Sequence, residues 1–147
     1  MAKKPEISLR ARAMRFLARR EYSRIELHGK LLPHVQEGDN LDEVLDELVA
    51  RGWLSDARAT TQLLHAKRHR FGAQRIEYDL KQKGIPEHLI EDALAELRVS
   101  ELDSARAVWD KKFGILACDT KEKSKQIRFL QSRGFSMEVI FKVLKLS

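Results

Sequence analysis

The stretch "FGAQRIEYDLKQKGIPEHLIEDAL", residues 71–94, contains two short helical patterns separated by a glycine and a proline. A related stretch, "KSKQIRFLQSRGFSMEVIFKVL", follows at residues 123–144. The positions that correspond are, in order, Leu80 and Leu130, Gly84 and Gly134, Ile90 and Ile140, and Leu94 and Leu144. A helical unit that returns at nearly constant spacing is typical of proteins built from stacked repeats.

Three expected helix ends share one local chemistry, in which a basic residue precedes a glycine and a large apolar residue follows it. The glycine adopts the left-handed conformation that closes a helix, and the apolar residue packs back on the last turn. The cation suits the negative end of the helix dipole. The three triplets are Arg51-Gly52-Trp53, Lys83-Gly84-Ile85 and Arg133-Gly134-Phe135. Only the later two end the second helix of a unit, so only these two indicate repetition.

Helical patterns also cover the rest of the chain. Ser23, three residues before Glu26, predicts a capping box, and Asn40 predicts the start of another helix. A further helix is expected from Ser55 or Asp56 to Phe71, one from Pro86 to about Leu97, and a separate one from about Glu101. Trp53 and Trp109 are expected to pack between units. The expected core includes Leu27, Leu31, Trp53, Leu54, Ile76, Leu80 and Leu94.

These patterns predict an all-α protein of three tandem three-helix units, at residues 8–54, 55–98 and 99–147. Each unit is too small to hold a core alone, so neighbouring units should stack end to end. The expected shape is an elongated, curved, solenoid-like chain. The sequence contains no β-strand pattern of useful length.

The excess of basic over acidic residues favours an anionic partner. Among 147 residues, 28 Lys and Arg outnumber 22 Asp and Glu, which gives a net charge of +6 and a pI of about 9.6. Such a balance attracts anions without specifying which. The single cysteine, Cys118, excludes an intramolecular disulfide and fits a cytoplasmic, reducing location. No apolar run approaches the length that spans a bilayer, so we expect no membrane partner.

Catalytic patterns are missing from the sequence. The seven glycines form no phosphate-binding loop. His65 and His69 have the spacing of two zinc ligands on a helix, but Lys67 and Arg68 between them repel a cation and no further ligand is nearby. We therefore expect a protein that is not an enzyme and that needs neither metal nor cofactor.

The stretch "AKRHRFGAQRIEYDLKQKG", residues 66–84, concentrates basic side chains around two aromatic residues. Arginine pairs equally well with carboxylates and phosphates, so this patch suits an acidic protein surface or a nucleic-acid backbone. Two simpler interpretations stay open. The cations are a solvated helix face that covers the core, or they neutralise acidic helices of neighbouring units.

Three segments, "RFLARREYSRIELHGKLL" at 15–32, "VLDELVARGWLSDARAT" at 44–60 and "RFGAQRIEYDLKQKGI" at 70–85, resemble the RecX family of bacterial regulatory proteins. The third unit is similar more loosely, in "RFLQSRGFSMEVI" at 128–140. The resemblance covers nearly the whole chain. It implies tandem three-helix repeats that resemble helix-turn-helix units.

The resemblance also implies a partner and a role. RecX proteins bind the RecA recombinase and the RecA–DNA filament, in its groove or at its growing end. ATP hydrolysis, strand exchange and co-protease activity of RecA then fall, which affects DNA repair, recombination and the SOS response. We expect a cytoplasmic monomer with weak direct binding to DNA. From charge and position, the residues expected to contact the filament are Arg20, Arg24, Lys30, Lys67, Arg68, Arg70, Arg75, Lys81, Lys83, Lys111, Lys112, Lys121, Lys123, Lys125 and Arg128.

Two other functions compete with this one. A DNA-binding regulator would need a recognition helix that carries Arg, Asn or Gln toward the bases. The acidic third helices of the first two units argue against it, but Gln126 and Arg128 are suitable side chains in the third unit. The other alternative is a general helical scaffold that binds unrelated helical peptides.

Overall fold

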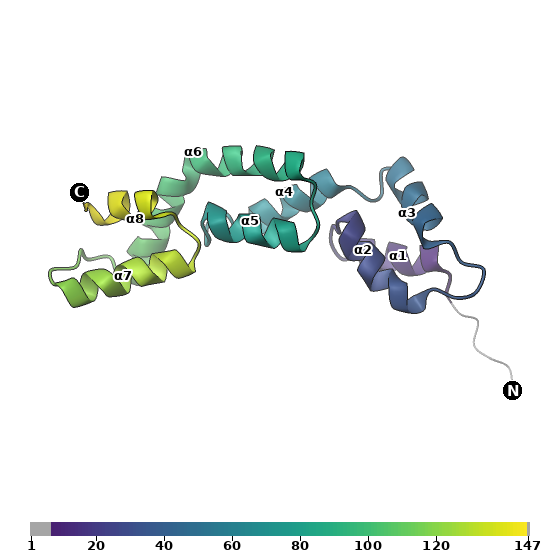
Figure 1. Cartoon of the computed structure of the whole chain (residues 1–147), viewed down its shortest axis with the longest axis horizontal. Coiled ribbons are helices and arrows are strands. Elements are labelled where there is room, and N and C mark those ends of the chain that lie inside the picture. The colour runs from purple at the N-terminus through teal and green to yellow at the C-terminus, as the bar shows by residue number, and fades with distance from the viewer. Residues whose placement is uncertain (1–6, 147) are drawn as a thin grey trace, which may run out of the picture.

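The computed structural model of the protein describes residues 7–146, and the regular structure in this range is entirely helical. Figure 1 shows the helices arranged as an elongated row, with the two termini at opposite ends. This confirms the all-α repeat fold expected from the sequence. The elements are α1 (Leu9–Leu17), α2 (Arg24–Leu31), a 3₁₀ turn η1 (Leu32–His34), α3 (Leu41–Ala50), α4 (Asp56–Lys67), α5 (Ala73–Gln82), α6 (Glu87–Lys112), α7 (Thr120–Ser132) and α8 (Met137–Leu144).

The helix starts predicted at Ser23 and Asn40 are confirmed. The Ser23 hydroxyl accepts from the Glu26 amide at 3.0 Å, and a Glu26 carboxylate oxygen accepts from the Ser23 amide at 3.0 Å. The side chain of Asn40 caps α3 by accepting from the Glu43 amide at 3.1 Å. These bonds satisfy amides that the first turn of a helix leaves without a partner.

The three glycine stop signals are also confirmed. Gly52, Gly84 and Gly134 have φ angles of 75°, 67° and 90°, in the left-handed region. In each case the amide of the next residue donates to a carbonyl in the last helical turn, as the Schellman motif requires. These bonds are Trp53 to Leu48 at 2.9 Å, Ile85 to Leu80 at 3.1 Å and Phe135 to Leu130 at 3.2 Å.

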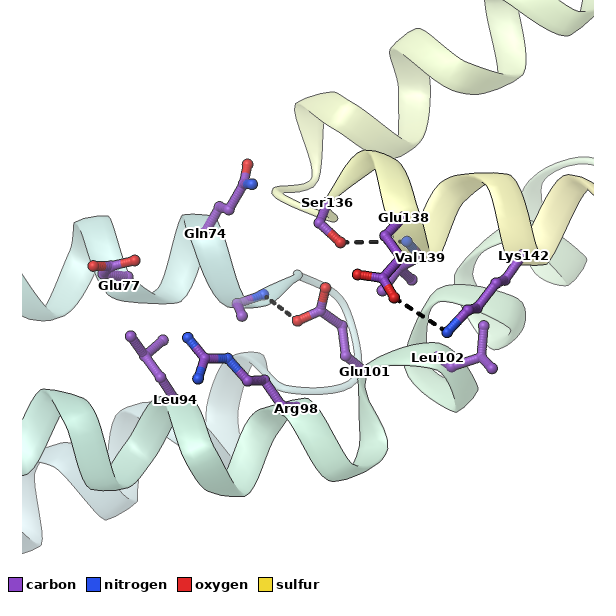
Figure 2. Close-up of a pocket in the computed structure, with 11 residues that line it drawn as sticks. Gln74, Glu77, Leu94, Arg98, Glu101, Leu102, Ser136, Glu138, Val139 and Lys142 are labelled. Atoms are coloured by element: carbon purple, nitrogen blue, oxygen red, sulfur yellow. Dashed lines mark hydrogen bonds and ion pairs between the residues drawn. The ribbon is translucent and has the colours of Figure 1, made fainter. Parts of the chain in front are cut away.

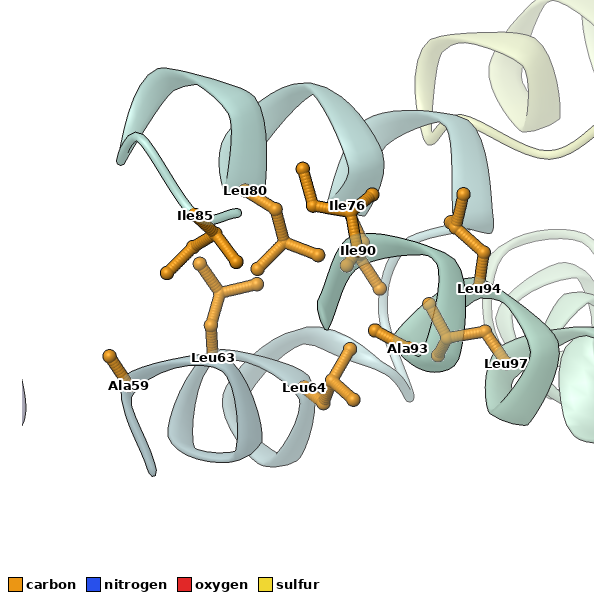
Figure 3. Close-up of a cluster of buried hydrophobic side chains, with 10 residues drawn as sticks. All are labelled: Ala59, Leu63, Leu64, Ile76, Leu80, Ile85, Ile90, Ala93, Leu94 and Leu97. Carbon is orange, nitrogen blue, oxygen red and sulfur yellow. The ribbon is translucent and has the colours of Figure 1, made fainter. Parts of the chain in front are cut away.

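Three separate apolar cores follow one another along the row. The first joins α1, α2 and α3 through side chains such as Leu27, Leu31 and Leu45. The third joins the second half of α6 to α7 and α8, around Phe135 and Ile140. Figure 3 shows the second core, built by α4, α5 and the first half of α6. Its buried residues are Ala59, Leu63, Leu64, Ile76, Leu80, Ile85, Ile90, Ala93, Leu94 and Leu97.

Helix α6 corrects the expected break near residue 98. One helix runs from Glu87 to Lys112, where two were predicted. No glycine or proline occurs between these ends, so nothing in the backbone stops the helix. Its buried positions continue at helical spacing through the predicted break, from Leu97 to Glu101 and Ala105. The proposed limit between residues 98 and 99 therefore falls inside a helix that two cores share.

Three smaller expectations were wrong. Helix α4 ends at Lys67 and not at Phe71, because the chain turns there to enter α5. Trp53 is 37% exposed and lies under Arg10 and Arg51, while the next residue, Leu54, enters the first core. Trp109 packs within the third core and not between units. The other expected core residues are buried, namely Leu27, Leu31, Leu54, Ile76, Leu80 and Leu94.

Candidate interaction surface

The units meet through a junction that occurs twice. At the first, the Ser23 hydroxyl at the start of α2 donates to the Lys83 carbonyl at the end of α5. At the second, the amides of Gly72 and Gln74 at the start of α5 donate to the carbonyls of Arg133 and Gly134 after α7, at 2.7 and 3.1 Å. The C-terminal end of one helix thus meets the N-terminal end of the next. Helices α7, α5 and α2 follow one another along one side of the row (Figure 1).

Both junctions depend on glycine for close approach. A Cβ added to Gly84 would lie 2.5 Å from the Ile25 side chain, and one added to Gly134 would lie 2.5 Å from the Arg75 backbone nitrogen. Gly52, which ends α3 with the same conformation, has nothing within 4 Å of such a Cβ. The later two glycines therefore act as contact points between units as well as helix stops.

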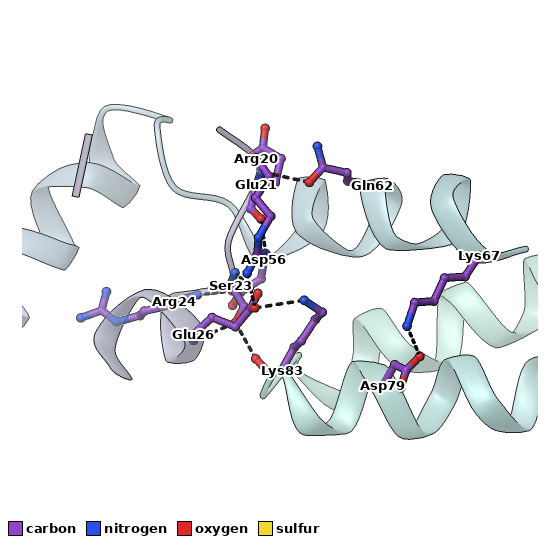
Figure 4. A network of polar contacts seen from close by, with 10 residues as sticks. All are labelled: Arg20, Glu21, Ser23, Arg24, Glu26, Asp56, Gln62, Lys67, Asp79 and Lys83. Atoms are coloured by element: carbon purple, nitrogen blue, oxygen red, sulfur yellow. Dashed lines mark hydrogen bonds and ion pairs between the residues drawn. The ribbon is translucent and has the colours of Figure 1, made fainter. Parts of the chain in front are cut away.

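Glu26 is the centre of the polar network at the first junction (Figure 4). Its Oε2 atom accepts from Arg20 at 3.0 Å and from the Lys83 ammonium at 3.0 Å. Burial alone would raise the pKa of Glu26, but the hydrogen bonds from Arg20, the Ser23 amide and Lys83 outweigh it and hold the pKa below its ordinary value. The carboxylate is thus charged and shared by the two units.

The same junction contains further contacts from the start of α4. The Asp56 carboxylate accepts from the Arg24 amide at 2.8 Å. Arg58 forms an ion pair with Glu21 at 3.0 Å, and the Glu21 amide donates to Gln62 at 2.9 Å. These side chains join the first unit to the second, so they position the units.

Most of the predicted cations in the first two units are already paired. Their ion pairs are Arg20 and Lys83 with Glu26, Arg24 with Asp46, Lys67 and Arg75 with Asp79, Arg68 with Glu96, and Lys81 with Glu77. The Arg68 side chain is only 20% exposed and also donates to Ser100. Within the patch at residues 66–84, only the pair of Lys83 with Glu26 joins two units, and the other pairs lie within the second unit. Most of these cations are therefore neutralised by acids of their own unit and not by acidic helices of a neighbouring unit.

The cations toward the C-terminus differ. Lys111, Lys112, Lys121, Lys123, Lys125 and Arg128 are exposed, and none of them forms an ion pair with a carboxylate of residues 7–146. Lys30 and Arg70 are also exposed and form no ion pair with a carboxylate of residues 7–146. Among the predicted contact residues, most of the cations that form no ion pair within residues 7–146 therefore lie on α7 and at the end of α6.

A groove of about 510 Å³ lies between the end of α6, α7 and the chain after α4. We call it the α6–α7 groove. It is lined by His69, Arg70, Ala107, Val108, Lys111, Lys112, Phe129 and Arg133. The sequence interpretation included three of its cations but missed Arg133 and Phe129, because the triplet at Gly134 was taken only as a helix stop. Their spacing of four residues on α7 was the available signal.

Cations and aromatic rings alternate beside this groove. The Arg133 guanidinium lies 5.4 Å from the Phe71 ring centre and 5.2 Å from the Phe129 ring centre. Lys112 lies 5.5 Å from Phe129, and Arg70 lies 5.6 Å from Phe71. Such contacts fix the position of a cation while its N–H donors stay available at the edge.

A second cavity of about 540 Å³ lies between α5, α6 and α8 and has mixed charge (Figure 2). Glu101 is 8% exposed and accepts from the Ala73 amide at 3.3 Å, which places a carboxylate at the positive end of α5. Lys142 pairs with Glu138 at 3.4 Å at the other side. These contacts give the cavity a structural role at the second junction.

Residues 7–146 contain neither a metal-binding cluster nor a helix suited to span a membrane. No group of three or more His, Cys, Asp or Glu side chains within it has a metal-binding arrangement. None of the helices that the structure describes combines the length and apolar composition needed to cross a membrane.

The fold and its surface define a tandem three-helix repeat protein with a basic C-terminal side. Sequence models of the second and third three-helix domains of RecX match residues 55–94 and 100–144. The regulatory protein RecX of Leptothrix cholodnii is 45% identical over 144 residues, which are 98% of this chain and 92% of that protein. RecX of Neisseria meningitidis serogroup B is 44% identical over 142 residues, covering 97% and 92%. The chain belongs to the RecX family.

A solved structure gives the same fold. The crystal structure of RecX from Lactobacillus salivarius superimposes with a TM-score of 0.74 at 20% identity, over 93% of this chain and 92% of that one. A regulatory role follows from the family.

Proposed function

We propose that this protein restrains the RecA recombinase by binding along the RecA–DNA filament, in its groove or at its growing end. Membership of the RecX family over nearly the whole chain carries the proposal. The shape supports it, because a row of three cores presents several contact points to a repeating partner. Weak contacts joined in one chain then multiply into avidity without a deep pocket.

The unpaired cations on α7 and at the end of α6 also support this proposal. A filament that contains DNA has a negative potential, which attracts an exposed positive face. The paired cations of the first two units, such as Lys83 and Arg68, contribute less to such an attraction because nearby carboxylates already neutralise them. We therefore place the main filament contact on the third unit. We also propose that the protein acts as a monomer that regulates DNA repair in the cytoplasm, a reducing compartment that its single cysteine fits.

The test is RecA ATP hydrolysis on single-stranded DNA, with this protein added at less than one molecule per RecA. We expect hydrolysis to fall. A variant with Lys121, Lys123, Lys125 and Arg128 changed to Gln should inhibit about tenfold less per molecule, a change of about 1.4 kcal/mol. The control changes Arg15 and Arg19 to Gln, two exposed cations at the other end of the row that likewise form no ion pair with a carboxylate of residues 7–146.

Two outcomes would contradict parts of the proposal. If both variants inhibit as well as the unchanged protein, the third unit is not the main contact. If the unchanged protein has no effect even in excess, restraint of RecA is not its function.

Direct readout of DNA sequence is less well supported. Gln126, one of the two side chains suited to reading bases, is 1% exposed. It accepts from the Trp109 indole at 2.9 Å and donates to the Ile115 carbonyl at 3.1 Å. A side chain held in this way is not available to a base edge. A footprint on one specific DNA site would revive this alternative.

A further inference from the structure

The α6–α7 groove combines a cationic rim with an apolar floor. Arg70, Lys111, Lys112 and Arg133 form the rim, and none of them pairs with a carboxylate of residues 7–146. Val108 and Phe129 contribute to the floor and are half-buried. In the cavity between α5, α6 and α8, by contrast, Lys142 pairs with Glu138. The groove is therefore a concave surface whose positive charge is left for an external anion.

Arg133 is the best-positioned donor in this groove. Its guanidinium contacts two aromatic rings, those of Phe71 and Phe129. Its backbone is also fixed, because its carbonyl accepts from the Gly72 amide at 2.7 Å. An arginine held by its flat face keeps its planar fork of N–H donors for a carboxylate or phosphate, and little side-chain entropy is lost when it binds.

The contacts of the aromatic rings distinguish between two classes of anionic partner, a nucleic acid and an acidic protein segment. Strands of nucleic acid bind typically by stacking bases on exposed aromatic rings beside a basic track. Phe129 is already contacted by Lys112, by Arg133 and by the edge of Phe113 at 5.4 Å. Phe71 is likewise surrounded by cations, including Arg75 at 5.0 Å. A base therefore finds no open ring, whereas an aliphatic or aromatic side chain of a peptide can occupy the apolar floor.

We propose that the α6–α7 groove binds an acidic peptide segment that contains an apolar anchor residue. The anchor packs on Val108 and Ala107, beside the covered ring of Phe129, and carboxylates next to the anchor pair with Arg133, Lys111 and Lys112. Charge sets the approach and the orientation of such a peptide, and burial of the apolar side chain adds affinity. This inference does not depend on restraint of RecA, because any partner that displays such a segment would be bound.

The test uses fluorescence anisotropy with a labelled synthetic dodecapeptide of Asp and Glu around a central Leu-Phe pair. The comparison probes are the same peptide with Ser-Ser at the centre and an oligothymidylate of equal charge. We expect the Leu-Phe peptide to bind about tenfold more tightly than the Ser-Ser peptide, because burial of two apolar side chains exceeds 1.4 kcal/mol. The variant K111Q/K112Q should weaken peptide binding about tenfold. R133K should also weaken it, because lysine keeps the charge but lacks the planar fork.

The control variant R15Q/R19Q removes two exposed cations at the other end of the chain and should leave peptide binding unchanged. Circular dichroism of each variant verifies that it is folded. The inference is overturned if the Ser-Ser peptide binds equally well, if K111Q/K112Q has no effect, or if the oligothymidylate binds as tightly as the Leu-Phe peptide. In the last case the groove is a nucleic-acid surface.

The same proteins are then assayed for inhibition of RecA ATP hydrolysis, which separates the two proposals. Peptide binding without any inhibition of RecA by the unchanged protein would end the proposed function and leave this inference standing. Inhibition of RecA without peptide binding would overturn this inference and leave the proposed function standing.

Discussion

Lys83 at the end of α5 forms an ion pair with Glu26 in the first turn of α2, with Nζ 3.0 Å from Oε2, although the two residues are 57 positions apart. This contact joins the first unit to the second. The Glu26 side chain is only 15% exposed, so water screens the pair little. The carboxylate also completes the capping box of α2, so one side chain stabilises both a helix and a junction.

Replacing Glu26 should therefore destabilise the protein. Glu26→Gln keeps the shape of the side chain but removes the charge that Arg20 and Lys83 share. We expect a loss of about 2 kcal/mol in the free energy of unfolding, because hydrogen bonds to charged, partly buried groups are involved. Urea unfolding followed by circular dichroism measures it. Glu138→Gln, in an exposed pair with Lys142, is the control and should cost less than about 0.5 kcal/mol. Equal losses would mean that the junction contact is unimportant.

The lowered pKa of Glu26 predicts a pH dependence. A carboxylate whose pKa is lower in the folded protein contributes stability above its unfolded pKa of about 4.5, and this stability is lost as pH falls through the folded pKa. The difference in stability between the unchanged protein and Glu26→Gln should be full at pH 7. It should shrink below pH 4.5 as Glu26 becomes protonated. A difference that stays constant down to pH 2.5 would contradict the assigned pKa direction.

Three glycines provide a graded test of the junctions. Gly52, Gly84 and Gly134 close helices in the same conformation, so alanine at each has the same backbone penalty of about 1 kcal/mol. Gly52→Ala meets no further contact, Gly84→Ala meets the Ile25 side chain, and Gly134→Ala meets the Arg75 backbone. We expect thermal stability to fall least at Gly52 and most at Gly134, with an added cost of about 1–3 kcal/mol at the junctions. Equal costs at all three would contradict the close packing of units.

Continuity of α6 is testable at Val99, whose side chain is 88% exposed. Because the side chain contacts little, a change there acts through the backbone. Val99→Pro should cost about 3 kcal/mol or more, since proline removes a hydrogen bond and clashes with the preceding turn. Val99→Ala, the control, should be neutral or slightly stabilising. If proline is tolerated, the chain breaks near residue 98 as the sequence alone suggested.

Gln126 should act in the third core and not in DNA readout. Gln126→Ala leaves the Trp109 indole N–H without its acceptor, and we expect a loss of about 1–3 kcal/mol in stability. Trp109 fluorescence should change in the folded protein, because the surroundings of the indole change. Gln131→Ala, at an exposed position on the same helix, is the control. Weaker DNA binding by a fully stable Gln126→Ala variant would contradict this role.

Local signals allowed much of the fold to be predicted. Helix caps act over three or four residues, so Ser23 with Glu26, and Gly84 with Ile85, can be recognised from neighbouring letters. Buried leucines such as Leu80 and Leu130 follow from helical spacing alone. The break predicted near residue 98 failed because a repeat boundary was taken to need a helix end, although no stop signal is present there.

The candidate site could be predicted only in part. Composition and spacing indicated where basic side chains occur, but they did not show which of these cations an acid neutralises in the folded protein. In the folded chain, Lys83 and Arg68 are neutralised by Glu26 and Glu96, whereas Lys111 and Lys112 are not. Arg133 was missed because the triplet at Gly134 was taken only as a helix stop, and its contact with Phe71 of the second unit appears only in the folded chain.

The sequence by itself determined the helical class of this protein, most of its helix ends and several buried residues of its first two cores, because these depend on periodicity and on hydrogen bonds between near neighbours. Only the tertiary structure decided which cations are left for a partner, how Gly84 and Gly134 bring the units together, and where a groove forms beside α7. These features depend on distances between residues far apart in the chain, and such distances are set by packing.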